Sequence, residues 1–309
     1  MQNATVSVVM PSLNQAQFVR QAVESVFSQR QDALELIVAD GGSSDGTLDV
    51  LEELSRSHPR LVWSSQADTG PAQAINRALS QAEGEFIGWL NSDDLYASQM
   101  MEKALSLFED HPELVMVYGH GQHIDGEGDL IGDYPTLPPP IEPQRFHAGC
   151  PICQPTVVFK STLLEEVGFL DEELKASFDF DYWLRVFGAY PGRIGFVDGV
   201  QAYSRLHDDC ITRNARRRVA TEGLIVTKRH LGSSSVHWLT TYLEEYADDA
   251  TDNVLVADLL AELDAVLAAA PGCVSSEDAA LARAQLELMG PMLAPSRGQD
   301  QSNRAGQVR

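Results

Sequence analysis

The chain has little of what marks a membrane-spanning, nucleic acid-coating or disulfide-stabilised protein. Four cysteines in 309 residues are too few for a disulfide scaffold, and the C-x-x-C spacing of Cys150 and Cys153 has no second pair to complete a zinc site. No run of 18 apolar residues occurs, and no charged and apolar signal segment opens the chain. Only 22 Lys and Arg face 45 Asp and Glu, and the net charge of −23 argues against a nucleic acid partner. We therefore expect a soluble cytoplasmic protein, with peripheral membrane association left open.

Two classes of nucleotide-binding enzyme are disfavoured by the residues that come after the first predicted strand. A dinucleotide oxidoreductase would carry G-x-G-x-x-G there, and a sugar nucleotidyltransferase would carry a glycine-rich loop with a basic residue. Residues 11–14 read Pro-Ser-Leu-Asn and supply neither pattern. Any phosphate binding by this acidic chain must therefore be local and assisted by a cation.

What the sequence does contain is a regular alternation of apolar strands and amphipathic helices. Hydrophobic residues make up 44% of the chain, which is enough for a sizeable core. Strands are predicted at 6–10, 34–39, 61–64 and 86–90, and the segments between them have apolar residues at helical spacing. This alternation predicts an α/β fold with a mostly parallel sheet flanked by helices on both faces.

After residue 110 the alternation gives way to a less regular pattern. The predicted elements are strands at 114–118, around 122–131, at 154–159 and at 196–203, with a helix at 178–187. Five prolines in residues 134–143 predict a surface loop that could act as a mobile lid. From about residue 231 the apolar spacing is helical, and residues 294–309 are polar and expected to be disordered.

Small and acidic residues follow the first three predicted strands, at the edge where an open α/β sheet binds its ligands. They are Pro11, Ser12 and Asn14 after the first strand, Asp40 after the second, and Asp68, Gly70 and Asn76 after the third. Asp40 could accept the imide N–H of uracil, and Asp68 could hold a ribose or a base. The same residues also suit simple turns and helix starts, and taken alone they support both interpretations about equally.

The strongest motif is a buried strand that runs directly into two carboxylates. Residues 86–90 are apolar, and Asn91, Asp93 and Asp94 come next. Adjacent acids repel each other unless a cation neutralises them, and a hard divalent ion shared with a diphosphate would do so. We expect Asp94 to bind the metal and Asp93 to hydrogen-bond the ribose or the sugar. A helix start would explain one acid at this point but not two.

The helix predicted at 178–187 carries two aspartates with different surroundings. Asp181 and Arg185 are four residues apart, which is the spacing of an ordinary ion pair on a helix, so Asp181 is expected to be structural. Asp179 lies at the helix start without a base at that spacing, beside aromatic side chains that would partly desolvate it and raise its basicity. Asp179 is therefore the candidate general base, and a helix cap is the alternative.

A histidine and a group of basic residues follow the last predicted strand of this region. His207 could complete the metal shell through one imidazole nitrogen, although a lone histidine is usually not a ligand. Residues 205–229, beginning with Arg205, hold 7 of the 22 basic residues. Positive charge gathered in an acidic chain suits a diphosphate leaving group, while a solvated basic helix remains the simpler interpretation for most of these arginines.

Together these motifs resemble the family 2 inverting glycosyltransferases of the GT-A fold, in particular the bacterial group that builds surface polysaccharides. The matching stretches are 8–14, 36–47, 68–70 with Asn76, 84–94, 154–156, 178–185 and 205–207. They occur in the order of the family and cover about residues 1–230. The resemblance implies a GT-A catalytic domain over 1–230, followed by a helical extension over 231–293 and a tail over 294–309.

The resemblance also implies roles for the candidate residues. Asp40 would contact uracil, Asp93 and Asp94 would form the family's DXD-type site, Asp179 would be the base, and His207 would assist the metal or the diphosphate. The other residues expected to bind the nucleotide sugar are Pro11, Ser12, Asn14, Asp68, Gly70, Asn76, Asn91 and Arg205. The family often has Glu-Asp at the base motif, whereas Phe178 precedes Asp179 here, so only one acid is available.

The implied activity is transfer of a sugar with inversion from a nucleotide diphosphate sugar, expected to be a UDP-sugar, to an acceptor hydroxyl. A divalent metal, Mn²⁺ or Mg²⁺, would assist, and the acceptor would be a glycan, a lipid-linked molecule or a small molecule in polysaccharide biosynthesis. The helices after 230 have no counterpart that we can place, and they could serve homodimer formation, acceptor binding or membrane contact. A protein that binds nucleotide sugars without transferring them, or a partner subunit, is the alternative.

Overall fold

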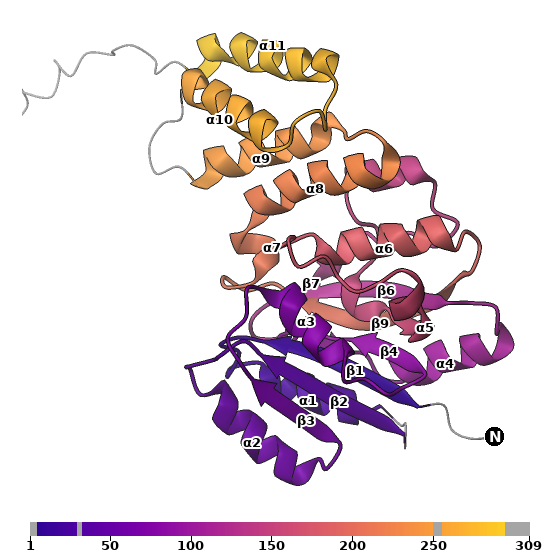
Figure 1. Ribbon diagram of the computed structural model, residues 1–309. Coiled ribbons are helices and arrows are strands. Elements are labelled where there is room, and N and C mark those ends of the chain that lie inside the picture. The colour runs from indigo at the N-terminus through magenta and orange to yellow at the C-terminus, as the bar shows by residue number, and fades with distance from the viewer. Residues whose placement is uncertain (1–4, 30–32, 250–254, 294–309) are drawn as a thin grey trace, which may run out of the picture.

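The computed structural model describes residues 5–29, 33–249 and 255–293. Within these ranges a nine-stranded sheet forms the centre, helices cover both of its faces, and further helices are stacked on one side (Figure 1). The fold class expected from the sequence, an α/β sheet with a C-terminal helical extension, is confirmed. The segment 294–309, for which disorder was predicted, lies outside the described residues.

The N-terminal part of the chain forms the parallel half of the sheet. Its elements are β1 (Val6–Ser12), α1 (Val19–Phe27), β2 (Leu34–Asp40), α2 (Thr47–Ser57), β3 (Leu61–Ser65), α3 (Pro71–Leu79) and β4 (Phe86–Trp89). The four strands lie in the order β3-β2-β1-β4 with every pair parallel. Ser12 is level with Asp40, and Asp40 is level with Ser65, so the strands end together at one edge. That edge is where the candidate residues were predicted to meet.

The other half of the sheet is mixed rather than mostly parallel. Its elements are β5 (Leu95–Tyr96), α4 (Met100–Asp110), β6 (Met116–Ile124), β7 (Leu130–Asp133), η1 (Pro143–Ala148), η2 (Gln154–Thr156), β8 (Val158–Lys160), α5 (Thr162–Glu166), α6 (Phe178–Ala189) and β9 (Ile194–Arg205). Strand β8 runs antiparallel to both β4 and β6, while β6 and β9 are parallel. β5 and β7 pair antiparallel with β9 and β6.

The strand predicted at 154–159 is shorter than expected. Gln154–Thr156 forms the short 3₁₀ helix η2, and only Val158–Lys160 joins the sheet. The reason is Pro155, which has no N–H to donate to a strand ladder and a fixed φ that suits a helical turn. The irregular segment places Gln154 beside the end of β4, where its Nε2 donates a hydrogen bond to the Trp89 carbonyl at 2.8 Å.

Each face of the sheet has its own hydrophobic core, as the alternation of side chains along a strand requires. On β1, Val8 packs with the helices α1, α2 and α4, whereas the neighbouring Val9 packs with α3 and α6 on the opposite face. Both side chains are fully buried. The continuous apolar run of this strand is thus explained by helices on both sides.

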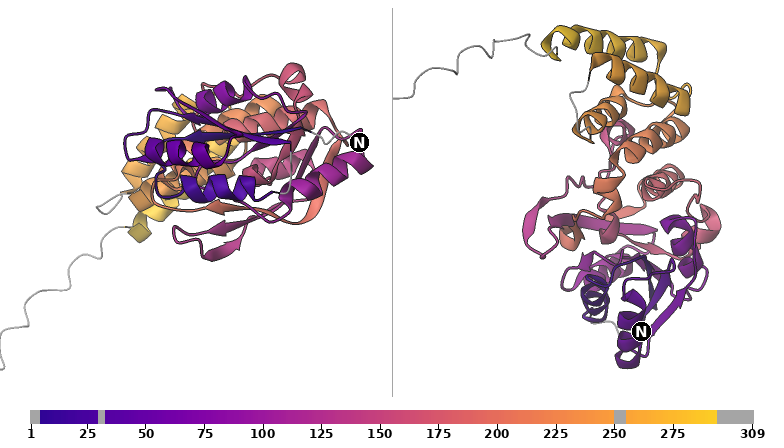
Figure 2. Two further views of the ribbon diagram at one scale, coloured as in Figure 1. Left: turned by 90° about the horizontal axis from the view of Figure 1, so that it is seen from below. Right: turned by 90° about the vertical axis from the view of Figure 1, so that its left-hand side faces the viewer.

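The C-terminal helices extend the core on the α3 and α6 side. They are α7 (Ile211–Asn214), α8 (Arg216–Leu231), α9 (Val236–Asp249), α10 (Val256–Ala269) and α11 (Ser276–Leu293). Figure 2 shows them stacked beyond the sheet, which makes the molecule elongated. Trp238 of α9 packs closely on Gly223 of α8, where a Cβ atom would lie 2.7 Å from its ring. None of the helices in the described ranges is long and apolar enough to cross a bilayer.

Candidate active site

A cavity of about 370 Å³ opens at the edge where the strands end. Its walls come from the ends of β1, β4 and β9, from the starts of α3 and α6, and from the loops around Tyr134 and Gln154. Of the predicted site residues, those that line the cavity are Pro11, Ser12, Asp68, Gly70, Asn91, Asp93, Asp94, Asp179 and Arg205. The predicted residues Asn14, Asp40, Asn76 and His207 do not line it.

The aspartate pair after β4 forms one side of the cavity. Asp94 is buried, its Oδ1 accepts a hydrogen bond from the Arg205 backbone N–H at 2.8 Å, and its Oδ2 accepts one from Asn91 Nδ2 at 3.2 Å. Burial, and after it the negative charge of Asp93, raises the pKa of Asp94 well above its usual value. A cation beside the pair would reverse this effect because it would stabilise the ionised carboxylate.

The residues present fit a metal that is shared with a ligand. Within the described ranges, no group of three or more His, Cys, Asp and Glu side chains is arranged to hold a metal ion. Magnesium and similar ions are commonly bound through one or two carboxylates plus the phosphates of a substrate. Asp93 and Asp94 open onto a cavity large enough for such a ligand, and they supply that number of carboxylates.

Asp179 forms another part of the cavity wall, on the first turn of α6. Its Oδ1 accepts a hydrogen bond from the Phe180 backbone N–H at 2.7 Å. Burial raises the pKa of Asp179 to about 6, against the lowering effect of the backbone hydrogen bonds. Phe178, which also lines the cavity, stacks on Trp89 with ring centroids 5.8 Å apart and supplies the apolar surroundings. The carboxylate can therefore act as a base near neutral pH.

Comparison with known proteins identifies the family of this chain. Residues 7–160, which contain the ends of β1 to β4 and the aspartate pair, match the model of glycosyl transferase family 2. The chain belongs to glycosyl transferase family 2. The family expected from the motifs is thereby confirmed.

Related glycosyltransferases share part of the chain. A chondroitin synthase from Escherichia coli is 30% identical over 181 residues, which are 59% of this chain and 26% of that protein. An uncharacterized glycosyltransferase from Rickettsia typhi is 28% identical over 229 residues, which are 68% of this chain and 66% of that protein. The chain thus spans about a quarter of the first relative and about two thirds of the second.

Solved structures share the fold of this glycosyltransferase. Residues 1–349 of TarS from Staphylococcus aureus, in complex with UDP-GlcNAc, superpose with a TM-score of 0.63 at 18% identity, covering 93% of this chain and 92% of that one. The mannosyltransferase PcManGT from Pyrobaculum calidifontis, in complex with GDP-Man and Mn²⁺, gives a TM-score of 0.57 at 20% identity, covering 94% and 81%. At such identities the likeness establishes the GT-A fold and not the substrate.

Two residues expected to bind the nucleotide instead organise the loops of this glycosyltransferase. Asp40 is fully buried, and its carboxylate accepts hydrogen bonds from the backbone N–H groups of Gly42 and Ser43 and from the hydroxyls of Ser43 and Ser65. The Asn14 Oδ1 accepts the Ser44 N–H at 2.9 Å and ties the loop after β1 to the loop after β2. Asp40 thus lies outside the cavity wall with its oxygens occupied, an arrangement that does not favour the predicted contact with uracil.

The Asn76 side chain also hydrogen-bonds the protein backbone and does not line the cavity, where it was expected to bind the ligand. Its side-chain amide donates to the Leu170 carbonyl at 3.0 Å, and its Oδ1 accepts the Leu170 N–H at 3.0 Å. The residue therefore joins α3 to the loop before α6. Asp68 and Gly70 do line the cavity, and the Asp68 carboxylate lies so close to Gly41 that a Cβ atom there would be 2.7 Å from it. A side chain at position 41 would thus collide with Asp68.

Arg205 does not present a free guanidinium to a diphosphate. Its Nε donates to the Asp93 carbonyl at 2.8 Å, its Nη1 to the carbonyls of Asp125 and Gly126, and its Nη2 to Gln21 Oε1 at 2.8 Å. The side chain is buried and lies over the Phe18 ring. Arg205 therefore fixes the loop of the aspartate pair to α1 and to the turn after β6. This structural role differs from the contact with the phosphate groups of the donor that the sequence suggested.

His207 pairs with the neighbouring aspartate and is not grouped with Asp94 as a metal ligand. Its Nε2 lies 3.0 Å from Asp93 Oδ2, and its ring is 4.7 Å from the ring of Phe18.

The basic residues that follow His207 form ion pairs away from the cavity. Arg213 pairs with Asp208, Arg216 with Glu245, and Arg229 with Asp171 and Asp181. None of these arginines lines the cavity, which agrees with the simpler interpretation of a basic helix.

The predicted ion pair within α6 is confirmed and is part of a larger arrangement. Arg185 Nε lies 3.0 Å from Asp181 Oδ2, while Arg229 Nη1 and His230 Nε2 each lie 2.8 Å from Asp181 Oδ1. Burial alone would raise the pKa of Asp181, but the hydrogen bond from His230 and the charge of Arg185 outweigh it and lower the pKa. Asp181 thereby joins α6 to α8.

Among the residues of the cavity wall that were not predicted as site residues, three are polar and come from β6, η2 and the loop after β7. Gln154 accepts a hydrogen bond from Asn91 Nδ2 at 3.1 Å, and the Tyr134 hydroxyl donates to the Cys150 carbonyl at 3.0 Å. His123 comes from β6, and burial lowers its pKa. The sequence held a clue to two of them, because Gln154 lies in a stretch that resembles the family and Tyr134 begins the proline-rich segment. It held no clue to His123, since no motif near that residue indicates a site.

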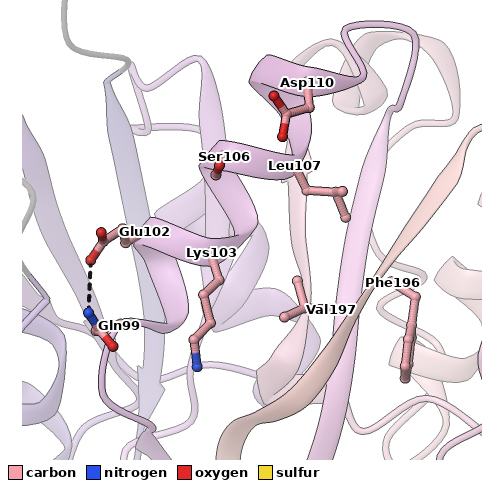
Figure 3. Close-up of a pocket in the computed structure, with 8 residues that line it drawn as sticks. All are labelled: Gln99, Glu102, Lys103, Ser106, Leu107, Asp110, Phe196 and Val197. Atoms are coloured by element: carbon pink, nitrogen blue, oxygen red, sulfur yellow. Dashed lines mark hydrogen bonds between the residues drawn. The ribbon is translucent and has the colours of Figure 1, made fainter.

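A second hollow, of about 360 Å³, lies between α4 and β9 (Figure 3). It is lined by Gln99, Glu102, Lys103, Ser106, Leu107, Asp110, Phe196 and Val197. Its polar side chains belong to one helix and its cap, and Gln99 hydrogen-bonds Glu102 at 3.4 Å. The hollow shares no residue with the cavity of the aspartates, so it is not part of the candidate active site.

Proposed function

We propose that this glycosyltransferase moves a sugar from a UDP-sugar to an acceptor hydroxyl with inversion at the anomeric carbon, assisted by Mn²⁺ or Mg²⁺, in glycan or polysaccharide biosynthesis. One observation carries the proposal: a single cavity joins a pair of adjacent aspartates to a third, desolvated aspartate. The pair could bind a diphosphate through a metal ion, and the third aspartate could act as the general base. The TarS structures in complex with UDP and with UDP-GlcNAc support a uridine donor.

The charges of the cavity support the need for a metal. Among the described residues, its wall carries five carboxylates, at Asp68, Asp93, Asp94, Asp179 and Asp209. The guanidinium of Arg205, which also belongs to the wall, is already hydrogen-bonded to protein oxygens. A diphosphate would be repelled by these surroundings unless a cation accompanied it. Asp93 and Asp94 would hold that cation, which when bound would neutralise the charge of the departing diphosphate.

The reaction follows from the positions of the protein groups. The Asp179 carboxylate, which lines the cavity, takes the proton of the acceptor hydroxyl as the hydroxyl oxygen forms a bond to the anomeric carbon. The bond from that carbon to the diphosphate oxygen breaks in the same step, on the opposite face of the sugar. A single displacement inverts the configuration. The stacked rings of Phe178 and Trp89 exclude water from the base and keep it basic.

Recognition of the uracil is assigned to a different aspartate from the one first expected. Asp68 lines the cavity beside Gly70, whereas the Asp40 oxygens are occupied within their own loop. We assign the base or ribose contact to Asp68. Asp40 contributes indirectly, because it fixes the shape of residues 40–43, against which Asp68 packs at Gly41.

The proposal is tested by donor titration and product analysis. Calorimetric titration with UDP-, GDP- and dTDP-sugars, each with Mn²⁺ or with EDTA, should show that UDP-sugars bind most tightly and that EDTA abolishes their binding. Proton NMR of the transferred sugar should show a β linkage from an α-linked donor. Retained configuration would refute the single displacement, and metal-independent binding would refute the role of the aspartate pair.

A further inference from the structure

Glu222 of α8 binds the backbone directly before the helix that carries Asp179. Its Oε1 accepts the Lys175 N–H at 2.9 Å, and its Oε2 accepts the N–H groups of Ala176 and Ser177, each at 2.8 Å. The side chain comes from 45 residues further along the chain and is 8% exposed. One buried carboxylate thus satisfies three consecutive amides at the entrance of α6.

This contact fixes the backbone that leads into α6. Ser177 stands at the cap position, yet its side chain makes no capping hydrogen bond, so the amides at the helix entrance have no acceptor from that side chain. An acid buried without partners would be strongly unfavourable, whereas three N–H donors compensate for its lost hydration. Glu222, from another helix, therefore holds the segment directly before α6 in place.

A second contact joins the same two helices on the far side of Asp179. Arg229 and His230 of α8 bind the Asp181 carboxylate at 2.8 Å. Glu222 and Arg229 are seven residues apart, which places them on one face of α8. Asp179 lies between the two attachments, at residues 175–177 and at residue 181. The base is therefore held from both sides by α8.

We propose that Glu222 is a positioning residue for sugar transfer: by holding the amides of residues 175–177 it sets the direction in which the Asp179 carboxylate faces the acceptor hydroxyl. This inference rests on the proposed function. Positioning of a base within a fraction of an ångström matters because small displacements of a reacting group cost large factors in rate.

The charge of Glu222 also acts on Asp179. After burial, Glu222 is among the causes that raise the pKa of Asp179. Burial keeps the pKa values of Tyr134, Cys150 and Cys153 well above their usual range, so these three neighbours stay neutral at the pH values of interest. The remaining titratable groups of the same cavity are Asp68, Asp93, Asp94, His123, Arg205, Asp209 and Cys210.

The test compares Glu222→Ala and Glu222→Gln with a matched control. Glu245 of α9 is also largely buried and binds α8 through Arg216 at 2.7 Å, but it does not contact residues 175–177, so Glu245→Gln is the control. For Glu222→Ala we expect kcat to fall about 10- to 100-fold, with the KM for the donor changed less than about twofold. Hydrogen exchange of the amides at 175–177 should accelerate in Glu222→Ala and not in the control.

Glu222→Gln keeps an oxygen acceptor but removes the charge. We expect its kcat plateau to stay within about threefold of the wild type, while the acid limb of its pH–rate profile moves to lower pH. A folded Glu222→Ala with the kcat of the wild type would overturn the inference. If Glu222→Ala fails to fold, an unmoved acid limb together with unchanged exchange in Glu222→Gln would overturn it. Absence of any transfer by the wild type would instead refute the proposed function, with the exchange data still deciding whether the contact exists.

Discussion

The carboxyl group of Asp179 lies on the first turn of α6, where the helix dipole favours the ionised form. Burial outweighs this influence and raises its pKa to about 6. Because the base must be ionised to accept a proton, kcat should rise with pH through about 6 and level off above it. At pH 5 it should be about a tenth of the plateau. A pH–rate profile at saturating donor checks this, and a flat profile between pH 5 and 8 would contradict it.

Arg205 provides a second prediction, because its effect on the donor is indirect. A lysine has one ammonium group and cannot serve the four oxygens that the Arg205 guanidinium binds. Arg205→Lys should loosen the loop of Asp93 and weaken UDP binding in the presence of Mn²⁺ at least about tenfold. The exposed Arg213, which pairs with Asp208, gives the control Arg213→Lys. Calorimetry measures the UDP affinity of both variants. Equal affinities would show that UDP binding does not depend on the hydrogen bonds that Arg205 makes to the loop of Asp93.

The residue types at strand ends could be predicted as site candidates, but their individual roles could not. Asp40 and Asp68 look equivalent in the sequence, since each follows a strand and precedes glycines. The structure separates them because the Asp40 oxygens meet Ser65, a residue of another strand. Asn76 and His207 differ from expectation for the same reason: each finds a partner that is distant in the chain. Such partners cannot be deduced from local spacing.

Helix α8 contains a glycine whose replacement tests how closely it packs on α9. In most helix interiors Gly→Ala stabilises a protein by about 0.5–1 kcal/mol. At Gly223 the new Cβ would lie 2.7 Å from the Trp238 ring, so Gly223→Ala should instead destabilise the protein, by about 1–3 kcal/mol. Gly188 of α6 has no atom within 4 Å of such a Cβ, so Gly188→Ala should stabilise it. The free energy of unfolding of both variants, measured in urea, tests this prediction. A more stable Gly223→Ala variant would contradict the close packing of α8 on α9.

The elements of the first hundred residues could be predicted because period and length separate strands from helices there. The mixed half of the sheet could not, since β8 reaches the sheet after a long irregular segment and pairs with both β4 and β6. Pro155 was visible in the sequence and should have shortened the strand predicted at 154–159. The helices after residue 231 could be predicted from the spacing of their apolar residues, but their packing on α8 could not.

Within the described residues, the hydrophobic core on the α3 and α6 face of the sheet continues into the C-terminal helices. Trp89, Trp183 and Trp238 belong to the same buried cluster, although they come from β4, α6 and α9. The boundary predicted at 230 falls within the last turn of α8, a helix that packs on α9. We therefore expect a single unfolding transition in urea, with far-ultraviolet circular dichroism and tryptophan fluorescence coinciding. An early, separate loss of helical signal would show that the C-terminal helices unfold independently.

The central claim is that one cavity binds the donor at the aspartate pair and activates the acceptor at Asp179. The most direct measurement is the rate of sugar transfer by Asp179→Asn beside its affinity for UDP with Mn²⁺, with Asp110→Asn on α4 as a control outside the site. We predict that transfer by Asp179→Asn falls at least about 100-fold while UDP affinity changes less than about twofold, and that the control matches the wild type. Transfer by Asp179→Asn at the rate of the wild type would contradict the account.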